Sequence, residues 1–182
     1  MPAAIPTSRG GWFASPELMS RDALPTYLND HLAGSVTAVE LLDRLIEQVD
    51  GDVRTRFVEL RSEIAADQQT LEDILHQVGG HESRVRALAG WLAEKAGQLK
   101  LLFDDPQRGK LGRLEALEIL RLGVHGKRGL WTALRAVQPQ IPELHGVDFE
   151  RLEQRAVAQH AQVEELRVES ARRVLGRHHS PN

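Results

Sequence analysis

Polar side chains interrupt the apolar faces of the helices that this 182-residue sequence predicts. Along each segment Leu, Val and Ile recur every three or four residues, which is the period of an α-helix that buries one face. The polar side chains that stand at such positions are His31, Ser35, Asp67, Lys95, Lys127 and Gln159. A charge is costly to bury unless an opposite charge accompanies it, so we expect these side chains to meet in the interior.

Two further carboxylates lie close to this set in the helical period. Glu63 stands one turn before Asp67 on the same side of its helix, and Glu118 flanks the apolar face of a later helix. The hypothesis that follows is a core polar network, in which carboxylates form ion pairs with lysines and an amide completes the hydrogen bonding. Its members are His31, Glu63, Asp67, Lys95, Glu118, Lys127 and Gln159. For Glu118 a surface ion pair with Arg121, three residues on, is the alternative.

Some of these residues allow a second chemistry, which is a metal site. Imidazole and carboxylate groups are ligands for iron and other divalent metals. The candidate ligands are His31, Glu63, Asp67 and Glu118. Inward lysines weaken this interpretation, because an ammonium group repels a dication and neutralises the carboxylates itself. We therefore expect no cofactor, and iron or another divalent metal is the alternative.

Other reaction classes have no support in the sequence. The chain contains no cysteine, which excludes disulfides, thiol nucleophiles, zinc-thiolate sites and iron–sulfur clusters. No segment predicts a strand, so a glycine-rich phosphate loop or a serine nucleophile elbow has no scaffold. We predict no catalytic residue, and a role in binding or interaction in preference to an enzymatic one.

Five segments with the helical period must position these side chains. They cover residues 23–49, 53–78, 82–103, 110–137 and 148–176. Long helices joined by short loops form antiparallel bundles, so the sequence predicts an all-α domain over 21–176, built as a four- or five-helix bundle. Residues 1–20 contain three prolines and two adjacent glycines and are expected to form a flexible arm. Residues 177–182 are expected to be a disordered tail.

Several residues mark the expected helix ends. Pro25 should lie in the first turn of the first helix, where its missing N–H does no harm. Gly79 and Gly80 should end the second helix, and Asp148 should cap the N-terminus of the last. The fourth helix contains three glycines spaced by three residues, namely Gly123, Gly126 and Gly129. Such spacing lets another backbone approach closely or marks a kink, and we predict close packing.

The charge of the chain is small overall and unevenly placed. The net charge is −3 and the pI about 6.2, but residues 1–80 hold 6 basic and 13 acidic side chains, whereas residues 81–182 hold 17 and 13. Basic clusters interleaved with aromatic residues are missing, and no apolar run reaches roughly 18 residues, so we expect neither nucleic acid nor a membrane as a partner. No secretory signal is evident, which predicts a cytoplasmic protein. The partner stays open, and a homo-oligomer is one alternative.

The helix order and the polar positions resemble the ferritin-like superfamily, in particular bacterial ferritin-like helical-bundle proteins of unknown function. The resemblance rests on a long first pair of helices, on two further long helices after an intervening segment, and on two motifs. These read Tyr-Leu-Asn-Asp-His-Leu-Ala-Gly over residues 27–34 and Glu-Ile-Ala-Ala-Asp over residues 63–67. The resemblance covers residues 22–176 and implies a ferritin-like bundle.

The resemblance also implies a di-metal site, built from one carboxylate on each of two helices and a Glu-x-x-His pair on each of the other two. This sequence contains no Glu-x-x-His; its second helix carries Glu63 and Asp67, four residues apart. On the fifth helix His160 and Glu164 flank the apolar face. The expected function is that of a ferritin-like bundle with an ion-pair network in place of a complete di-metal site. The alternative is a divalent-metal protein of the di-iron type that handles iron or oxidants.

Overall fold

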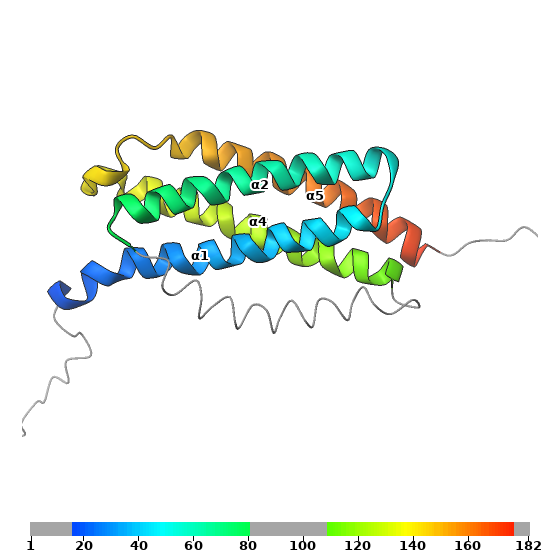
Figure 1. Cartoon of the computed structure of the whole chain (residues 1–182), viewed down its shortest axis with the longest axis horizontal. Coiled ribbons are helices and arrows are strands. Elements are labelled where there is room, and N and C mark those ends of the chain that lie inside the picture. The colour runs from blue at the N-terminus through cyan, green and yellow to red at the C-terminus, as the bar shows by residue number, and fades with distance from the viewer. Residues whose placement is uncertain (1–15, 81–108, 177–182) are drawn as a thin grey trace, which may run out of the picture.

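The computed structural model describes residues 16–80 and 109–176, and these form four α-helices (Figure 1). The helices are α1 (Pro16–Glu47), α2 (Gly51–Gln77), α4 (Gly109–Val137) and α5 (Phe149–Leu175), and two 3-10 turns, η1 (Gln138–Gln140) and η2 (Pro142–Leu144), join α4 to α5. These two ranges contain no strand, which confirms the all-helical prediction. No helix within them combines the length and the apolar character that crossing a membrane requires.

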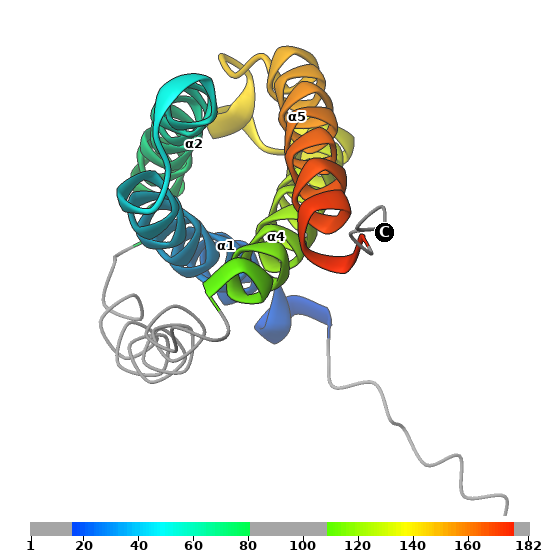
Figure 2. The ribbon, with the colours of Figure 1, turned by 90° about the vertical axis from the view of Figure 1, so that its right-hand side faces the viewer.

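The helices form two antiparallel hairpins that pack against each other (Figure 2). α1 packs against α2 in one hairpin and α4 against α5 in the other, and the hairpins meet where α1 contacts α4. Seen along the bundle, α2 and α5 complete the ring on the side away from that contact (Figure 2). Because α2 and α4 run in the same direction, the end of α2 and the start of α4 lie at opposite ends of the bundle (Figure 1).

The start of α1 differs from the sequence prediction. Pro16 takes the first helical position, where a missing N–H leaves no hydrogen bond unmade, so residues 16–20 belong to the helix and not to a flexible arm. Pro25 consequently lies inside the helix and not in its first turn. Three expected segments lie outside the described residues: the arm over 1–15, the helix over 82–103 with Lys95, and the tail over 177–182.

The other helix ends agree with the prediction. α2 ends at Gln77, and Gly79 follows with a φ of +74°, a left-handed conformation that glycine adopts without strain. The Asp148 carboxylate accepts a hydrogen bond from the backbone N–H of Arg151 at 3.0 Å, so it caps α5 as expected. Both α4 and α5 begin and end within one residue of their predicted bounds.

The interior contains two separate apolar clusters, one toward each end of the bundle, and each takes side chains from all four helices. The cluster nearer the α1–α2 turn includes Leu42, Phe57, Leu120 and Leu166. The cluster at the other end surrounds Trp131 and includes Leu28, Ile74 and Phe149. Full burial of such side chains contributes roughly 1.5–3 kcal/mol each, so these clusters hold the helices together. A layer of polar side chains lies between the two clusters, and the packing of the clusters holds the helices together on both sides of it.

Candidate functional site

A layer of polar side chains separates the two apolar clusters. On each of three helices one polar residue stands between a residue of one cluster and a residue of the other. The triplets are Ile64, Asp67 and Leu71 on α2, Val124, Lys127 and Leu130 on α4, and Val163, Gln159 and Ala156 on α5. The helical period therefore places the three polar side chains at one level of the bundle, and their backbones are held there by the apolar residues on either side.

Asp67 is the centre of this layer. Its side chain is 2% exposed, and its Oδ2 lies 2.5 Å from the Lys127 Nζ. The guanidinium of Arg155 donates to the other oxygen, Oδ1. The Gln159 amide also donates to Oδ2, at 3.2 Å. Two cations and one amide thus satisfy a single buried carboxylate, which is the condition under which a charge can be kept away from water.

The remaining contacts extend the layer toward solvent. Lys127 donates to the carbonyl oxygen of the Gln159 side chain, and the amide nitrogen of Gln159 donates to Glu63 Oε2 at 3.0 Å. Glu63 itself is exposed, so it forms the outer edge of the layer and not its core. We call the five connected residues the polar network: Glu63, Asp67, Lys127, Arg155 and Gln159. It contains two carboxylates and two cations, so its formal charges cancel.

Burial and ion pairing shift the pKa of Lys127 in opposite directions. Burial lowers the pKa of the Lys127 ammonium, because the charged form loses its hydration, while the neighbouring Asp67 carboxylate opposes that change. The net direction is downward. The ion pair is therefore held in place by its geometry at a cost in desolvation, as is usual for ion pairs away from water.

The polar network connects α2 to α5. These two helices lie on the side of the ring opposite the contact between α1 and α4 (Figure 2). Glu63 and Asp67 stand four residues apart on α2, as do Arg155 and Gln159 on α5, and residues at this spacing share a helix face. Outside the network, Arg56 on α2 also reaches α5, where its guanidinium lies 3.0 Å from the carboxylate of Glu165. Long polar side chains thus span the distance between these helices.

Arg155 was not among the residues predicted from the sequence to join the polar network. It stands just outside the predicted apolar face of α5, next to Ala156, and its side chain is 30% exposed. An arginine can keep part of its length at the surface while its guanidinium reaches inward. Its spacing of four residues from Gln159 is the signal that could have pointed to it.

His31 lies near the polar network without a hydrogen bond to it. The ring of Tyr27 packs edge-on against the imidazole, with 4.7 Å between ring centroids. Partial burial lowers the pKa of His31, and the charge of Asp30 only partly opposes this. On the next turn the Ser35 hydroxyl donates to the backbone carbonyl of Leu32 at 2.6 Å, which satisfies it within its own helix. α1 therefore contributes no hydrogen bond to the network among the described contacts.

Glu118 lies away from the polar network, which corrects the prediction that it belongs there. Its side chain is 54% exposed and lies 3.7 Å from the guanidinium of Arg167 on α5. The alternative pair with Arg121 is also wrong, because Arg121 lies 2.9 Å from Glu164. The hydrogen-bonded Arg167 holds the pKa of Glu164 down at about 2. Glu118 is placed on the flank of α4, where it faces the neighbouring helix at the surface.

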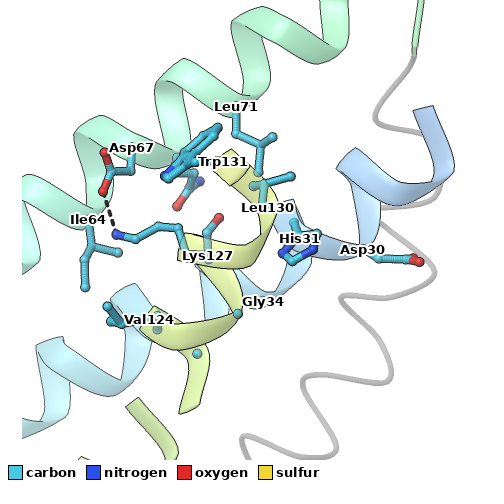
Figure 3. Close-up of a pocket in the computed structure, with 15 residues that line it drawn as sticks. Asp30, His31, Gly34, Ile64, Asp67, Leu71, Val124, Lys127, Leu130 and Trp131 are labelled. Atoms are coloured by element: carbon cyan, nitrogen blue, oxygen red, sulfur yellow. Dashed lines mark hydrogen bonds and ion pairs between the residues drawn. The ribbon is translucent and has the colours of Figure 1, made fainter. Parts of the chain in front are cut away.

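A cavity of about 200 Å³ opens beside the polar network, between α1, α2 and α4 (Figure 3). Lys127 extends toward Asp67 at one side of it, and His31 lies at the other (Figure 3). The wall between them is largely apolar and is formed by Ile64, Leu71, Val124, Leu130 and Trp131. We call this space the central cavity.

Two glycines of α4 line the central cavity, and they do not have the role that their spacing predicted. A Cβ atom placed on Gly123, Gly126 or Gly129 would meet no described atom within 4 Å. The prediction of close packing against another backbone is therefore wrong for the described part of the chain. Gly123 and Gly126 leave open space at the cavity, whereas Gly129 lies outside its lining.

The arrangement does not fit the di-metal centre that the ferritin-like resemblance implies. Both oxygens of Asp67 already accept hydrogen bonds, and two cations lie where a dication would have to sit. Across residues 16–80 and 109–176 no group of three or more His, Asp or Glu side chains could hold a metal ion. The four candidate ligands are also dispersed, since Glu118 and His31 have no contact with the Asp67 carboxylate among the described interactions.

Comparison with known proteins adds no family to this description: no protein-family model, curated protein or solved structure matches the chain.

Proposed function

We propose that this protein is a ferritin-like helical bundle that acts by binding, with a buried ion-pair network in place of the family's di-metal site. The observation that carries the proposal is the surroundings of Asp67, whose carboxylate is shared by Lys127, Arg155 and Gln159. These three side chains take up the lone pairs that a metal would use. The network then serves to set the register of α2, α4 and α5, because only one alignment of the helices pairs all its charges.

The helix directions support the ferritin-like part of the proposal. α2 and α4 run the same way, so the end of α2 and the start of α4 lie at opposite ends of the bundle (Figure 1). A single long crossover between two antiparallel hairpins is the connectivity of ferritin-like folds. The polar network takes residues from three helices at one level, whereas a di-metal site in such a bundle takes residues from all four.

The central cavity is where we place the binding. Its wall is apolar, and the charges of Asp67 and Lys127 at its side cancel each other. A site of this kind favours a small, neutral and largely apolar molecule, because such a ligand displaces water from apolar surface and leaves the ion pair intact. Gly126 provides a position at which the cavity can be filled by substitution.

The metal-free part of the proposal is tested by elemental analysis of protein produced in iron-supplemented medium and purified without chelator. We expect iron, manganese and zinc well below one atom per chain. Stoichiometric metal that is lost in Asp67→Asn and retained in Glu118→Gln would overturn this part, because it would show that Asp67 ligates a metal. Metal retained in both variants would overturn it as well and would place the metal elsewhere.

The binding part is tested by calorimetric titration with toluene as a neutral apolar probe. We expect saturable binding to the unmodified protein, a loss of at least tenfold in affinity in Gly126→Leu, and unchanged affinity in Gly129→Leu. Both glycines lie on α4 with open space around them, but only Gly126 lines the central cavity. Equal affinity in the two variants, or no saturable binding at all, would overturn the assignment of the cavity.

A further inference from the structure

A second cavity, of about 350 Å³, lies at one end of the bundle. It forms where the first turns of α2 and α4 meet the last turns of α5, and we call it the end cavity. Its apolar part is made by the half-buried Val53 and Val174, together with the deeply buried Phe57, Leu117 and Leu166. Its charged part is made mainly by cations, which are Lys110, Arg113 and Arg173.

The cations of the end cavity are not balanced by carboxylates. Glu169 is the one acidic residue in the lining, and its Oε1 already lies 2.6 Å from Arg173. Its other oxygen, Oε2, lies 3.8 Å from Arg56. Neither Lys110 nor Arg113 has an ion pair within the part of the chain that the structure describes. The lining therefore carries more positive than negative charge.

Arg113 shows the consequence of this imbalance most clearly. Its Nε is buried and has no hydrogen-bond acceptor among the described residues. Burial lowers the pKa of Arg113, and the positive charge of Arg173 lowers it further. A buried donor without an acceptor and two guanidinium groups that repel each other are both relieved by one ligand, an anion placed between them.

Lys110 stands in the first turn of α4, and that turn contains no acidic side chain. Helix N-termini carry a partial positive charge that favours anions, so the backbone adds to the effect of the side chains there. The apolar residues behind the cations add a second requirement. A ligand that fills the cavity needs an apolar body as well as a negative group, since a bare hydrated ion would leave the half-buried Val53 and Val174 in contact with water.

We propose that the end cavity binds an organic anion with an apolar body, of the class of medium-chain carboxylates. The carboxylate would pair with the guanidinium of Arg113, which can donate two parallel hydrogen bonds to it, and the hydrocarbon part would lie against Val53 and Val174. This site goes beyond the proposed function, because it uses a different cavity and a different chemical class of ligand from the central cavity.

The test is calorimetric titration of the full chain with octanoate at low salt, below the concentration at which octanoate forms micelles. We expect saturable binding, with acetate and 1-octanol each at least tenfold weaker, because each lacks one of the two required parts. Arg113→Gln should lower the octanoate affinity at least tenfold. Arg172→Gln is the matched control, since Arg172 is exposed in the same helical turn as Arg173 and does not line the cavity; it should leave the affinity within twofold.

Circular dichroism establishes that each variant is folded, and Lys110→Gln replaces Arg113→Gln if the latter is not. Equal affinity of the lining variant and Arg172→Gln, or no saturable octanoate binding, would overturn the proposal. Inorganic phosphate bound as tightly as octanoate would overturn it in favour of a simple anion site. Binding of 1-octanol as tight as that of octanoate would overturn it in favour of an uncharged ligand.

Discussion

Partly buried cations have opposite electrostatic surroundings in the middle of this bundle and at one of its ends. In the middle, Lys127 and Arg155 converge on Asp67, and the attraction of that carboxylate opposes the lowering of the Lys127 pKa by burial. At the end, burial also lowers the pKa of Arg113, but there the neighbouring charge of Arg173 lowers it further. We propose that the charges balanced within the chain set the alignment of the helices, whereas the charges that are not balanced leave an interaction for a ligand to make.

The largest effect should come from removing the anion in the middle. Asp67→Asn keeps the size of the side chain and leaves two cations without a buried counter-charge, so we expect a loss of about 3 kcal/mol in the free energy of unfolding. Urea unfolding followed by circular dichroism measures this. As a control, Glu118→Gln removes an exposed carboxylate and should change the free energy by no more than about 0.5 kcal/mol. Similar losses in both variants would contradict the difference between buried and surface pairs.

A double variant tests whether the loss in Asp67→Asn comes from the cations that it leaves unpaired. In Asp67→Asn/Lys127→Met one of the stranded cations is replaced by an apolar side chain of similar length, so roughly half of the loss should be recovered. The coupling between the two positions, obtained from the two single variants and the double variant, measures how strongly the pair depends on each partner. Strictly additive losses would mean that Asp67 and Lys127 stabilise the bundle independently.

The next effect concerns the open space beside the middle layer. Gly126→Ala should raise the free energy of unfolding by about 0.5–1 kcal/mol, because alanine favours a helix over glycine and its Cβ meets no described atom. Gly79→Ala is the counterpart and should cost about 1 kcal/mol, since Gly79 has a φ of +74°. Thermal unfolding compares the two. A loss in Gly126→Ala would show that another backbone packs on this face after all.

A smaller effect, opposite in sign to that of Asp67→Asn, should come from the end cavity. Arg113→Gln removes a partly buried cation that is repelled by Arg173, so at low salt we expect an increase of up to about 0.5 kcal/mol in the free energy of unfolding. In 1 M salt, where charges are screened beyond about 3 Å, the increase should shrink. Urea unfolding at the two salt concentrations measures this. A loss of stability at low salt would reveal a counter-charge that balances Arg113.

The smallest effect should be the pH dependence contributed by His31. Its pKa in the folded protein lies below the ordinary histidine value of 6.5, so the unfolded chain binds the proton more readily. This part of the stability is therefore complete above pH 6.5 and is lost as the pH falls from there toward the folded pKa. His31→Gln should flatten the fall in unfolding free energy between pH 6.5 and 5, whereas His145→Gln, at an exposed position, should not. An unchanged slope in His31→Gln would contradict the burial of the imidazole.

The helical period of the apolar residues, together with other patterns among residues close in the chain, explains which features could be predicted from the sequence. The all-helical class, the bounds of α4 and α5 and the cap at Asp148 depend on residues within a few positions of each other. The inward positions of Asp67 and Gln159 follow from the same period, because each replaces an apolar residue in a row that must be buried. The start of α1 was missed because two prolines can each open a helix, and the pattern alone does not choose between Pro16 and Pro25.

The partners of these residues were decided only by the tertiary structure. A side chain at the edge of a helix face turns inward or outward with a small rotation of the helix, which is why Arg155 entered the polar network and Glu118 did not. The same holds for the glycines of α4, whose spacing permits either a close contact or an open cavity. The sequence by itself determined the four described helices and the inward positions of Asp67 and Gln159. The packing of the two hairpins determined which of these charges meet, since that depends on distances between segments far apart in the chain.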